Sequence, residues 1–430
     1  MPKKSQNVSI PLHLKRSATL YINEQCNALE KEGRKIYRMG LGQSPFPVPE
    51  VVVDSLKQHA NKKKYLPVKG LPELRNTVAE FHQRMDGLDF KSENIMIGPG
   101  SKELMFLLQS VLDWDIILPT PCWVSYAPQA EILGNRIHFI HTRFENGWRL
   151  TPNLLTEFLD RNILNQNKLI ILNYPGNPDG STYSNDELKD IAEIFRKNKI
   201  TVLSDEIYGL INHNGIHSSI AKYYPKGTIV SSGLSKWCGA GGWRLGTMSF
   251  PEELSWILEP MAMIASETYT SVCAPIQYAA ITAFLGGSII DDYLFHLRRI
   301  LKTIGTKCFE LFNENSINVI APKGGFYLFP VFNEFQNTLI SRGIITSEDF
   351  CNDLLEVTGV ASLPGSDFNR KHTELSCRLA YVNFDGTEAL KISESIGKSP
   401  NLTIDDLTAV CGDVLVGINK LIEFVRIHKS

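Results

Sequence analysis

Residues 168–208 read KLIILNYPGNPDGSTYSNDELKDIAEIFRKNKITVLSDEIY. Two short apolar runs, Lys168–Asn173 and Ile200–Leu203, enclose a helical pattern over Asp186–Asn198. Strands that alternate with helices in this way are typical of α/β proteins with a mostly parallel sheet. This stretch therefore predicts an α/β fold.

The same alternation continues on both sides of this stretch. Further short runs lie at 95–97, 115–118, 136–141 and 228–231, and helical patterns lie at 24–32, 50–60, 71–84, 101–112, 123–133 and 151–162. After residue 250 the sequence becomes helical, with a long segment at 289–313. Two strands at 326–330 and 378–382 and a closing helix at 407–428 then indicate a second unit.

These patterns predict two domains. We expect a large domain over 55–295, in which helices sandwich a mostly parallel sheet, and a smaller α+β domain built from residues 1–54 and 296–430. A chain of 430 residues is long enough for roughly two to three domains. Residues 385–405 are polar and contain Gly, Ser and Pro, so we expect a surface excursion there.

Composition and charge narrow the function classes. The net charge of -2 gives no electrostatic reason to expect nucleic acid or an anionic membrane as a partner. The start Met-Pro-Lys-Lys-Ser lacks the apolar core of a signal peptide, and no apolar run is long enough for a membrane span, so we expect a cytoplasmic protein. The 8 cysteines form no CxxC pair and accompany no histidine cluster, so neither a metal site nor a disulfide framework is expected.

Two glycine-containing turns follow predicted strands. Gly98-Pro-Gly-Ser-Lys102 precedes a helix, whose free N–H groups would suit a phosphate, although such a turn is commonly just a turn. Asn173-Tyr-Pro-Gly-Asn-Pro-Asp-Gly180 lies at a strand's carboxyl end, where ligands bind in open α/β sheets. Asn177 could donate to a phenolic oxygen there, and an ordinary Asn-Pro turn is the alternative.

Two further polar segments follow the next strands. In Ser204-Asp-Glu-Ile-Tyr208 the Asp205 carboxylate could pair with a protonated ring nitrogen, cap a helix or bind a metal, although no second ligand cluster supports a metal. Ser231-Ser-Gly-Leu-Ser-Lys-Trp-Cys-Gly-Ala-Gly-Gly-Trp-Arg-Leu-Gly246 places Lys236 in a polar, glycine-rich turn, with Arg244 eight positions on. Most lysines are solvated surface charges, but the position of Lys236 beside serines and an arginine at a strand end predicts a reactive amine.

Together the four segments resemble the class I and II aminotransferases of the aspartate aminotransferase superfamily. The resemblance covers roughly residues 35–385 and includes the segments 41–49, 65–75, 121–126, 324–327 and 377–379. It implies a pyridoxal 5′-phosphate (PLP) enzyme that moves an amino group from an amino acid to a 2-oxo acid by a ping-pong mechanism, through a Schiff base on Lys236. The cofactor supplies the electron sink for the carbanion.

The resemblance also implies roles for individual residues around the cofactor ring. Asp205 would pair with the pyridine nitrogen, Tyr208 and Asn177 would hydrogen-bond the phenolic oxygen, and Trp123 would stack on the ring. Lys236, Asp205 and Tyr208 are thus the predicted catalytic residues. Trp123 could instead belong to the core.

The phosphate and the substrate have their own predicted partners. The phosphate would be bound by Gly100, Ser101, Lys102, Ser235 and Arg244, with the backbone of Ser101 and Lys102 donating. The α-carboxylate would be bound by Arg378, in a bidentate fork, and by Gly42 and Asn177. Tyr65 would reach the phosphate of a neighbouring subunit, which implies a homodimer with shared sites. Tyr65 as a surface residue and Arg378 as an exposed strand residue are the alternatives.

The sequence departs from the family pattern at two positions. Asp179 replaces the usual Thr of Asn-Pro-Thr-Gly, and Gly233 replaces a phosphate-binding Ser that Ser231 or Ser232 could supply. Tyr126 and Trp243 are further candidate pocket neighbours. The donor amino acid is not identified.

Two other functions use related sequences. C–S lyases and other α,β-eliminating enzymes, as well as aminocyclopropane-carboxylate synthases, share the same motifs. A non-enzymatic regulator with a DNA-binding segment is not expected, because only about 35 residues precede the resemblance and they carry no basic stripe.

Overall fold

A seven-stranded sheet forms the centre of the protein. The computed structural model describes residues 18–399 and 401–427, and its largest sheet has the order β2-β8-β7-β6-β5-β3-β4. The bounds are β2 Ile95–Gly98, β3 Asp115–Thr120, β4 Ile137–His141, β5 Lys168–Asn173, β6 Thr201–Asp205, β7 Thr228–Gly233 and β8 Gly246–Ser249. Strands β3 to β7 are parallel, and β8 runs antiparallel to β7 and β2. The predicted mostly parallel sheet is confirmed.

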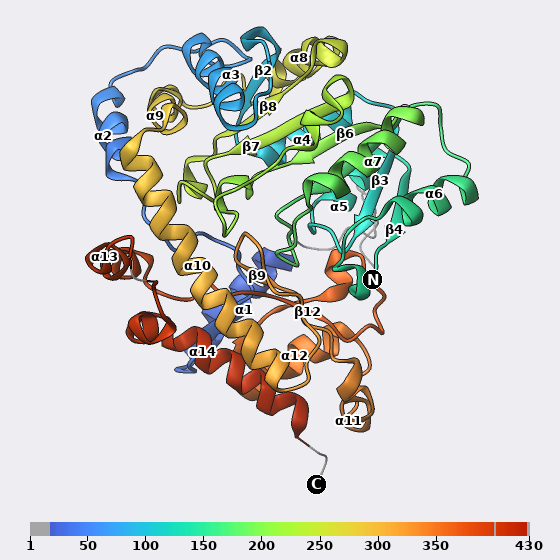
Figure 1. Ribbon diagram of the computed structural model, residues 1–430, viewed down its shortest axis with the longest axis vertical. Coiled ribbons are helices and arrows are strands. Elements are labelled where there is room, and N and C mark those ends of the chain that lie inside the picture. The colour runs from blue at the N-terminus through green and yellow to red at the C-terminus, as the bar shows by residue number, and fades with distance from the viewer. Residues whose placement is uncertain (1–17, 400, 428–430) are drawn as a thin grey trace, which may run out of the picture.

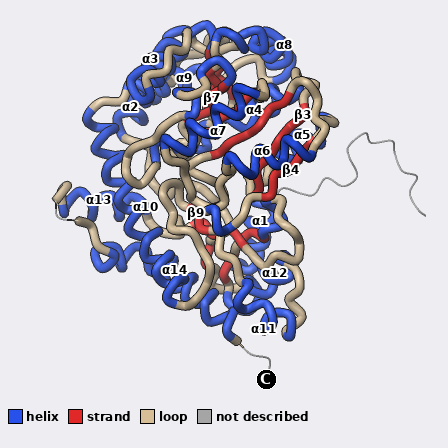
Figure 2. The backbone as a smooth tube through the Cα atoms, turned by 45° about the vertical axis from the view of Figure 1, so that its right-hand side comes forward, coloured by secondary structure: helices blue, strands red, loops and turns tan. Residues whose placement is uncertain are grey.

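Helices cover both faces of this sheet, so its strands are enclosed (Figures 1 and 2). Neighbouring strand residues enter opposite cores: Leu169 and Ile171 pack with one set of helices, Ile170 and Leu172 with the other. The first set is α4 (Ser101–Ser110), α5 (Tyr126–Leu133) and α8 (Leu258–Thr268), and the second is α6 (Pro152–Arg161) and α7 (Asn185–Lys197). Burial on both faces explains why the strands are continuous apolar runs rather than alternating ones.

Three more helices lie beside the β2 edge of the sheet (Figure 1). They are α2 (Glu50–His59), α3 (Pro72–Asp86) and α9 (Ala274–Leu285). Helix α9 packs against both α2 and α3. Their buried residues join those of the second unit in one continuous hydrophobic cluster, which connects the two parts of the molecule.

Segments from both chain ends build the second, smaller unit. Strand β1 (Tyr37–Arg38) pairs in parallel with β10 (Val360–Ala361). Beside this pair, β11 (Leu363–Pro364), β12 (Cys377–Ala380) and β9 (Tyr327–Leu328) form an antiparallel sheet. The surrounding helices are α1 (Ala18–Lys31), α10 (Ser288–Glu314), α11 (Gln336–Ser341), α12 (Ser347–Thr358) and α14 (Ile404–Arg426). The predicted smaller α+β unit is confirmed, and the expected end of the closing helix at His428 lies outside the described residues.

Helix α10 runs from the large unit into the small one (Figure 1). The predicted boundary between residues 295 and 296 falls inside this helix. We propose that the two domains divide along α10, which both share.

The segment 385–405, where we expected a surface excursion, has many exposed residues and contains a helix that the sequence analysis did not predict. Residues Gly386–Ile396 form helix α13, which Asp385 caps by accepting the N–H groups of Thr387 and Glu388. Arg299 of α10 holds its end, donating at 2.7 Å to both the Ser393 Oγ and the Gly397 carbonyl. The polar composition fits a helix with an exposed side, and the hydrogen bonds from α10 hold only its end.

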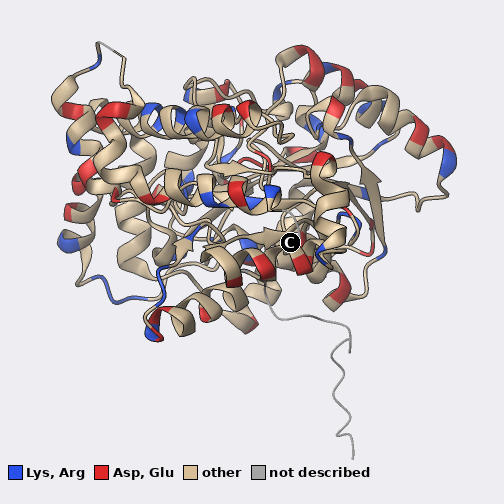
Figure 3. Ribbon diagram, turned by 90° about the horizontal axis from the view of Figure 1, so that it is seen from below, with Lys and Arg blue, Asp and Glu red and all other residues tan. Residues whose placement is uncertain are grey.

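The surface and the cysteines add little to the functional picture. In the view of Figure 3, basic and acidic residues are interspersed along the visible helices. None of the helices in residues 18–399 and 401–427 is long and apolar enough to cross a membrane. All eight cysteines are free thiols, and Cys273 is the exposed one.

Gly246 brings β8 against the start of α4, which generates a prediction for stability. A Cβ at Gly246 would lie 2.3 Å from the Ser101 nitrogen and 2.5 Å from the Gly100 carbonyl carbon. These are backbone atoms, so Gly246→Ala must push the start of α4 away from the sheet. We expect the free energy of unfolding in urea to fall by roughly 1–3 kcal/mol. Gly242→Ala is the control, since a Cβ there meets nothing within 4 Å; equal loss in both variants would contradict the packing argument.

Candidate active site

The predicted residues converge on one cavity at the carboxyl edge of the sheet. The cavity has a volume of about 430 Å³ and is lined by side chains from five strand ends and the adjoining turns. The predicted residues that line it are Ser101, Lys102, Trp123, Asn177, Asp205, Tyr208, Ser235, Lys236 and Arg244. Asn173 and Ile207 also line it and were not predicted. No group of three or more potential metal ligands occurs in the described parts of the chain.

Asp205 is the carboxyl residue that lines the cavity, at the end of β6. Only 3% of it is exposed. Its Oδ2 accepts the Tyr126 hydroxyl at 2.5 Å, and its Oδ1 accepts the N–H of Ile207 at 3.4 Å. Burial raises the pKa of Asp205 to about 6, against the lowering effect of the Tyr126 hydrogen bond. A cation brought to this carboxylate would be strongly favoured, as the protonated nitrogen of PLP would be. The helix-cap alternative is wrong, since the next helical turn has Tyr208 as its N-cap.

Lys236 reaches the N-terminal segment of the chain. Its Nζ donates to the Gly42 carbonyl at 2.7 Å and lies 5.5 Å from the centre of the Tyr208 ring. The ring of Phe326 is 5.7 Å away. The amine is therefore held among aromatic rings in the cavity, where an aldehyde could bind it.

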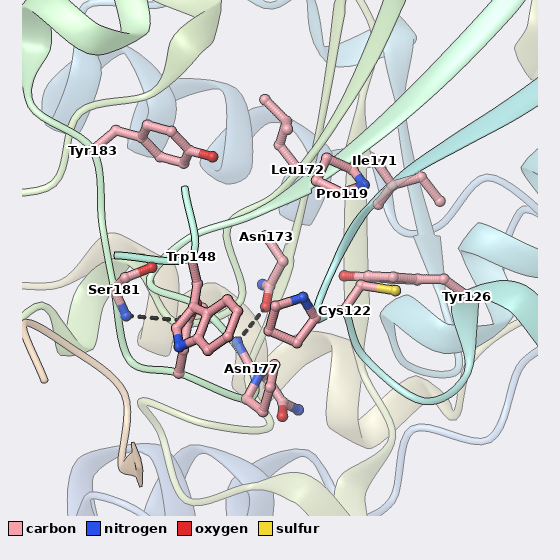
Figure 4. Close-up of a pocket in the computed structure, with 14 residues that line it drawn as sticks. Pro119, Cys122, Tyr126, Trp148, Ile171, Leu172, Asn173, Asn177, Ser181 and Tyr183 are labelled. Carbon is pink, nitrogen blue, oxygen red and sulfur yellow. Dashed lines mark hydrogen bonds between the residues drawn. The ribbon is translucent and has the colours of Figure 1, made fainter. Parts of the chain in front are cut away.

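Asn177 sits on a turn that is tied to the neighbouring strands (Figure 4). Its N–H donates to the Asn173 Oδ1 at 2.8 Å, and the Asn173 Nδ2 donates to the Asp205 carbonyl at 2.9 Å. The carbonyl oxygen of the Asn177 side chain accepts from Arg378 at 3.2 Å. Its amide N–H₂ is thus the end that can donate to a ligand oxygen. A second cavity of about 40 Å³ lies behind this turn, between Trp148, Tyr183 and the turn itself.

The N-terminus of helix α4 and the Arg244 guanidinium lie close together at one corner of the cavity. Helix α4 begins at Ser101 after Gly100, whose φ is 90°. A Cβ at Gly100 would lie 2.1 Å from the Arg244 Nη2, so only glycine admits the guanidinium this close. Arg244 itself has a left-handed backbone and donates to the carbonyls of Gly241 and Pro99. Helix N–H groups, Ser235 and this guanidinium form a donor set that fits a phosphate dianion.

Arg378 lies beside the cavity, and the exposed-strand alternative for it is wrong. Only 2% of the residue is exposed. Its Nη2 donates to the Gly40 carbonyl at 2.5 Å. The guanidinium also contacts the aromatic rings of Tyr327 and Phe368. The Nε is buried with no hydrogen-bond partner among the described residues. Burial lowers the pKa of the guanidinium, so a buried carboxylate that took the free Nε donor would stabilise it.

The side chain of Lys102 was not foreseen as part of the site. Its Nζ lies 5.0 Å from the centre of the Trp123 ring. Burial lowers its pKa, and the nearby Arg244 and Lys236 charges lower it further. Within residues 18–399 and 401–427 its ammonium has no ion pair or hydrogen bond. The sequence motif predicted only that the Lys102 backbone N–H binds a phosphate. The position of the ammonium in the cavity follows from contacts that only the structure shows.

Among the candidate residues that do not line the cavity, Gly42, Gly100, Tyr126 and Arg378 contact residues that do, whereas Tyr65 and Trp243 lie apart from it. Tyr65 is 90% exposed and points to no group of the site in this chain. Trp243 is partly buried against the large core instead. Tyr126, in contrast, reaches the site through its bond to Asp205.

The two departures from the family pattern have physical explanations. Asp179 is buried and its Oδ1 accepts the N–H of Ser181 at 2.9 Å, so the turn is kept, and burial raises its pKa to about 6. A Cβ at Gly233 would lie 2.7 Å from the Leu245 carbonyl oxygen, so a serine does not fit there. Ser231 and Ser232, the expected substitutes, are not among the residues that line the cavity.

Comparisons with known proteins found one matching family and several relatives. Residues 34–388 match the family described as aminotransferase class I and II. An aspartate aminotransferase of Bacillus subtilis is 31% identical, covering 85% of this chain and 92% of that protein. An asparagine–oxo-acid transaminase of Streptococcus mutans is 30% identical, covering 93% and 98%. The solved aspartate aminotransferase of Thermus thermophilus with maleate superposes with a TM-score of 0.78 at 27% identity, covering 89% and 96%.

The buried carboxyl of Asp205 generates a prediction for stability against pH. Because its pKa in the folded, cofactor-free chain is raised to about 6 from 3.8, its contribution is fully present below about pH 4 and is lost as the pH rises through 6. Asp205→Asn avoids this loss, so the stability of the cofactor-free variant relative to the parent should increase by roughly 1–2 kcal/mol between pH 5 and pH 8. Urea unfolding at both pH values measures it.

The matched control is Asp54→Asn, on the surface of α2 with a side chain that is 49% exposed. It should show no such gain. An Asp205→Asn variant whose advantage did not grow with pH would contradict the assigned burial cost.

Proposed function

The chain belongs to the class I and II aminotransferases, and from that premise we propose that it transfers the amino group of an amino acid with an acidic side chain, with Lys236 as the residue that carries PLP. Dependence on PLP and transamination between amino acids and 2-oxo acids are the properties of this family. The residue roles and the substrate class are proposals. The observation that carries the substrate class is the unpaired Lys102 ammonium in the cavity.

The residues around the cavity would hold the cofactor as follows. The Lys236 amine would bind its aldehyde, Asp205 its pyridine nitrogen, and Tyr208 and Asn177 its phenolic oxygen. Arg244, Ser235 and the N–H groups of α4 would bind its phosphate, together with the close approach at Gly100. When bound, the cofactor supplies an electron sink for charge that develops at the substrate Cα.

The chain's own residues would orient the substrate and move one proton. Arg378 would bind the α-carboxylate through its free Nε and an Nη, which fixes the direction of the Cα–H bond. The Lys236 amine would take the proton from the substrate Cα and deliver it to the cofactor carbon that bears the amino nitrogen, and in the other half it would move a proton from that carbon to the Cα of the second substrate. Asp205, as a carboxylate, would keep the nearby ring nitrogen protonated throughout.

The cofactor and an acidic amino acid together carry three anionic groups, and the site has three cationic side chains that could bind them. Arg244 would take the phosphate and Arg378 the α-carboxylate, which leaves Lys102 for a carboxylate on the substrate side chain. The ammonium is partly buried, so binding an anion would offset the burial that lowers its pKa. The names of two relatives, an aspartate aminotransferase and an asparagine–oxo-acid transaminase, support a short acidic or amide side chain.

We also propose that the enzyme is a cytoplasmic homodimer. Tyr65 is a large side chain that is 90% exposed, and a second subunit would give its hydroxyl a phosphate to bind. Eight unpaired cysteines suit a reducing compartment.

The role of Lys236 generates a direct prediction. The purified protein should bind PLP and absorb in the visible or near-ultraviolet, and Lys236→Ala should lose that band because no amine remains to bind the aldehyde. Spectra recorded after loading with PLP and removal of the unbound cofactor measure this. Lys302→Ala, at a lysine outside the cavity that donates to Asn214, is the control and should keep the band. A Lys236→Ala spectrum identical to that of the parent would contradict the assignment.

The role of Lys102 generates a prediction about specificity. Lys102→Met keeps most of the side-chain volume and removes the charge, so kcat/KM for aspartate should fall by roughly 10- to 100-fold. The value for alanine should change little, because alanine has no side-chain carboxylate. Steady-state rates with 2-oxoglutarate as acceptor and saturating PLP measure both. An equal fall for the two substrates would assign Lys102 to the cofactor instead.

A further inference from the structure

Tyr327 is a buried side chain beside the cavity, in the segment 324–327, to which the sequence analysis assigned no role. Only 1% of it is exposed. Its hydroxyl is 2.9 Å from the hydroxyl of Tyr208, and the two rings pack edge to face with centres 5.6 Å apart. Tyr327 therefore contacts one of the residues that hold the cofactor in the proposed function.

The same side chain also contacts the substrate-binding residues. The Arg378 guanidinium lies 4.8 Å from the centre of the Tyr327 ring. A Cβ at Gly42 would be 1.9 Å from the Tyr327 hydroxyl, so that hydroxyl lies where any other residue would place a side chain. Gly42 in turn accepts from Lys236 through its carbonyl. The ring is thus fixed on several sides and has little freedom to turn.

The count of protons decides the direction of the hydrogen bond between the two tyrosines. Burial, and next the neighbouring Tyr327, raise the pKa of Tyr208 well above its usual range, so Tyr208 is a neutral hydroxyl with one proton. If that proton is donated to the phenolic oxygen of the cofactor, the Tyr208 oxygen can only accept from Tyr327. Among the described residues, Tyr208 is the one hydrogen-bond partner of the Tyr327 hydroxyl.

We propose that Tyr327 is a positioning residue, which donates its proton to Tyr208 and thereby directs the Tyr208 proton at the phenolic oxygen of PLP. The inference rests on the proposed function and adds a residue to it. A hydrogen bond accepted by a hydroxyl strengthens the bond that the same hydroxyl donates. Tyr327 acts through Tyr208 and need not touch the cofactor.

The proposal predicts a spectroscopic effect of Tyr327→Phe. Hydrogen-bond donation by Tyr208 would stabilise the deprotonated form of the bound cofactor, because in that form the phenolic oxygen of the cofactor carries the negative charge. Weaker donation should raise the pH midpoint of the cofactor's absorbance change by about half a pH unit, the size expected for part of a hydrogen bond. Weaker donation to the cofactor should also lower kcat several-fold. The phenylalanine ring still packs under Arg378, so the KM for the amino acid should stay within about twofold.

Two companion variants make the test specific. Tyr381→Phe removes another fully buried hydroxyl, which lies 3.4 Å from the Gly325 carbonyl and from the His213 Nε2 and makes no hydrogen bond to Tyr208 among the described residues. Its midpoint should equal that of the parent, and its thermal stability shows what the loss of a buried hydroxyl does by itself. In Tyr208→Phe the midpoint should rise further, and adding Tyr327→Phe to it should change nothing more.

The outcomes separate this inference from the proposed function. A raised midpoint in Tyr327→Phe that vanishes in the Tyr208→Phe background supports it. An unchanged midpoint, or equal shifts in the presence and absence of the Tyr208 hydroxyl, overturns it while Tyr208 keeps its proposed role. If Tyr208→Phe itself leaves the midpoint unchanged, the roles of both tyrosines are wrong.

Discussion

The burial of the Asp205 carboxyl at the end of β6 is the constraint on which the rest of the site depends. Burial raises its pKa to about 6, so the cofactor-free fold holds a charge at neutral pH that it stabilises poorly. The Tyr126 hydroxyl at 2.5 Å offsets part of that cost. A cation that binds the carboxylate would offset the rest of the free-energy cost of its burial. The fold can therefore bind a protonated ring nitrogen tightly, although the cofactor-free protein is less stable.

The other charges of the site follow from the same edge of the sheet. Parallel strands bring their carboxyl ends together, so the end of β6 places Asp205, and the turns after β5 and β7 place Asn177 and Lys236, around one cavity. The small unit then covers this edge with chain from both ends: Gly42 accepts from Lys236, while Arg378 donates to Gly40 and to Asn177. Tyr327 packs where these segments meet.

The sequence predicted the parts that depend on local pattern. The central strands were recognisable because both faces are buried, and Asp205, Asn177 and Lys236 because each follows a strand. Strand β8 was missed because its four residues, Gly246–Ser249, follow a glycine-rich turn and carry no clear period. The free Lys102 ammonium and the Tyr208–Tyr327 bond were missed because they arise from contacts across the fold, the latter between residues 119 positions apart.

A single half-reaction tests most directly whether the enzyme transfers the amino group. The PLP-loaded enzyme is mixed with aspartate and no 2-oxo acid, and the 2-oxo acid, the ammonia and the absorbance spectrum are followed together. Transamination should give one equivalent of 2-oxo acid per site, a lasting change in the spectrum and no ammonia, since the amino group stays on the enzyme until an acceptor arrives. Continuous release of ammonia with an unchanged spectrum would contradict transamination.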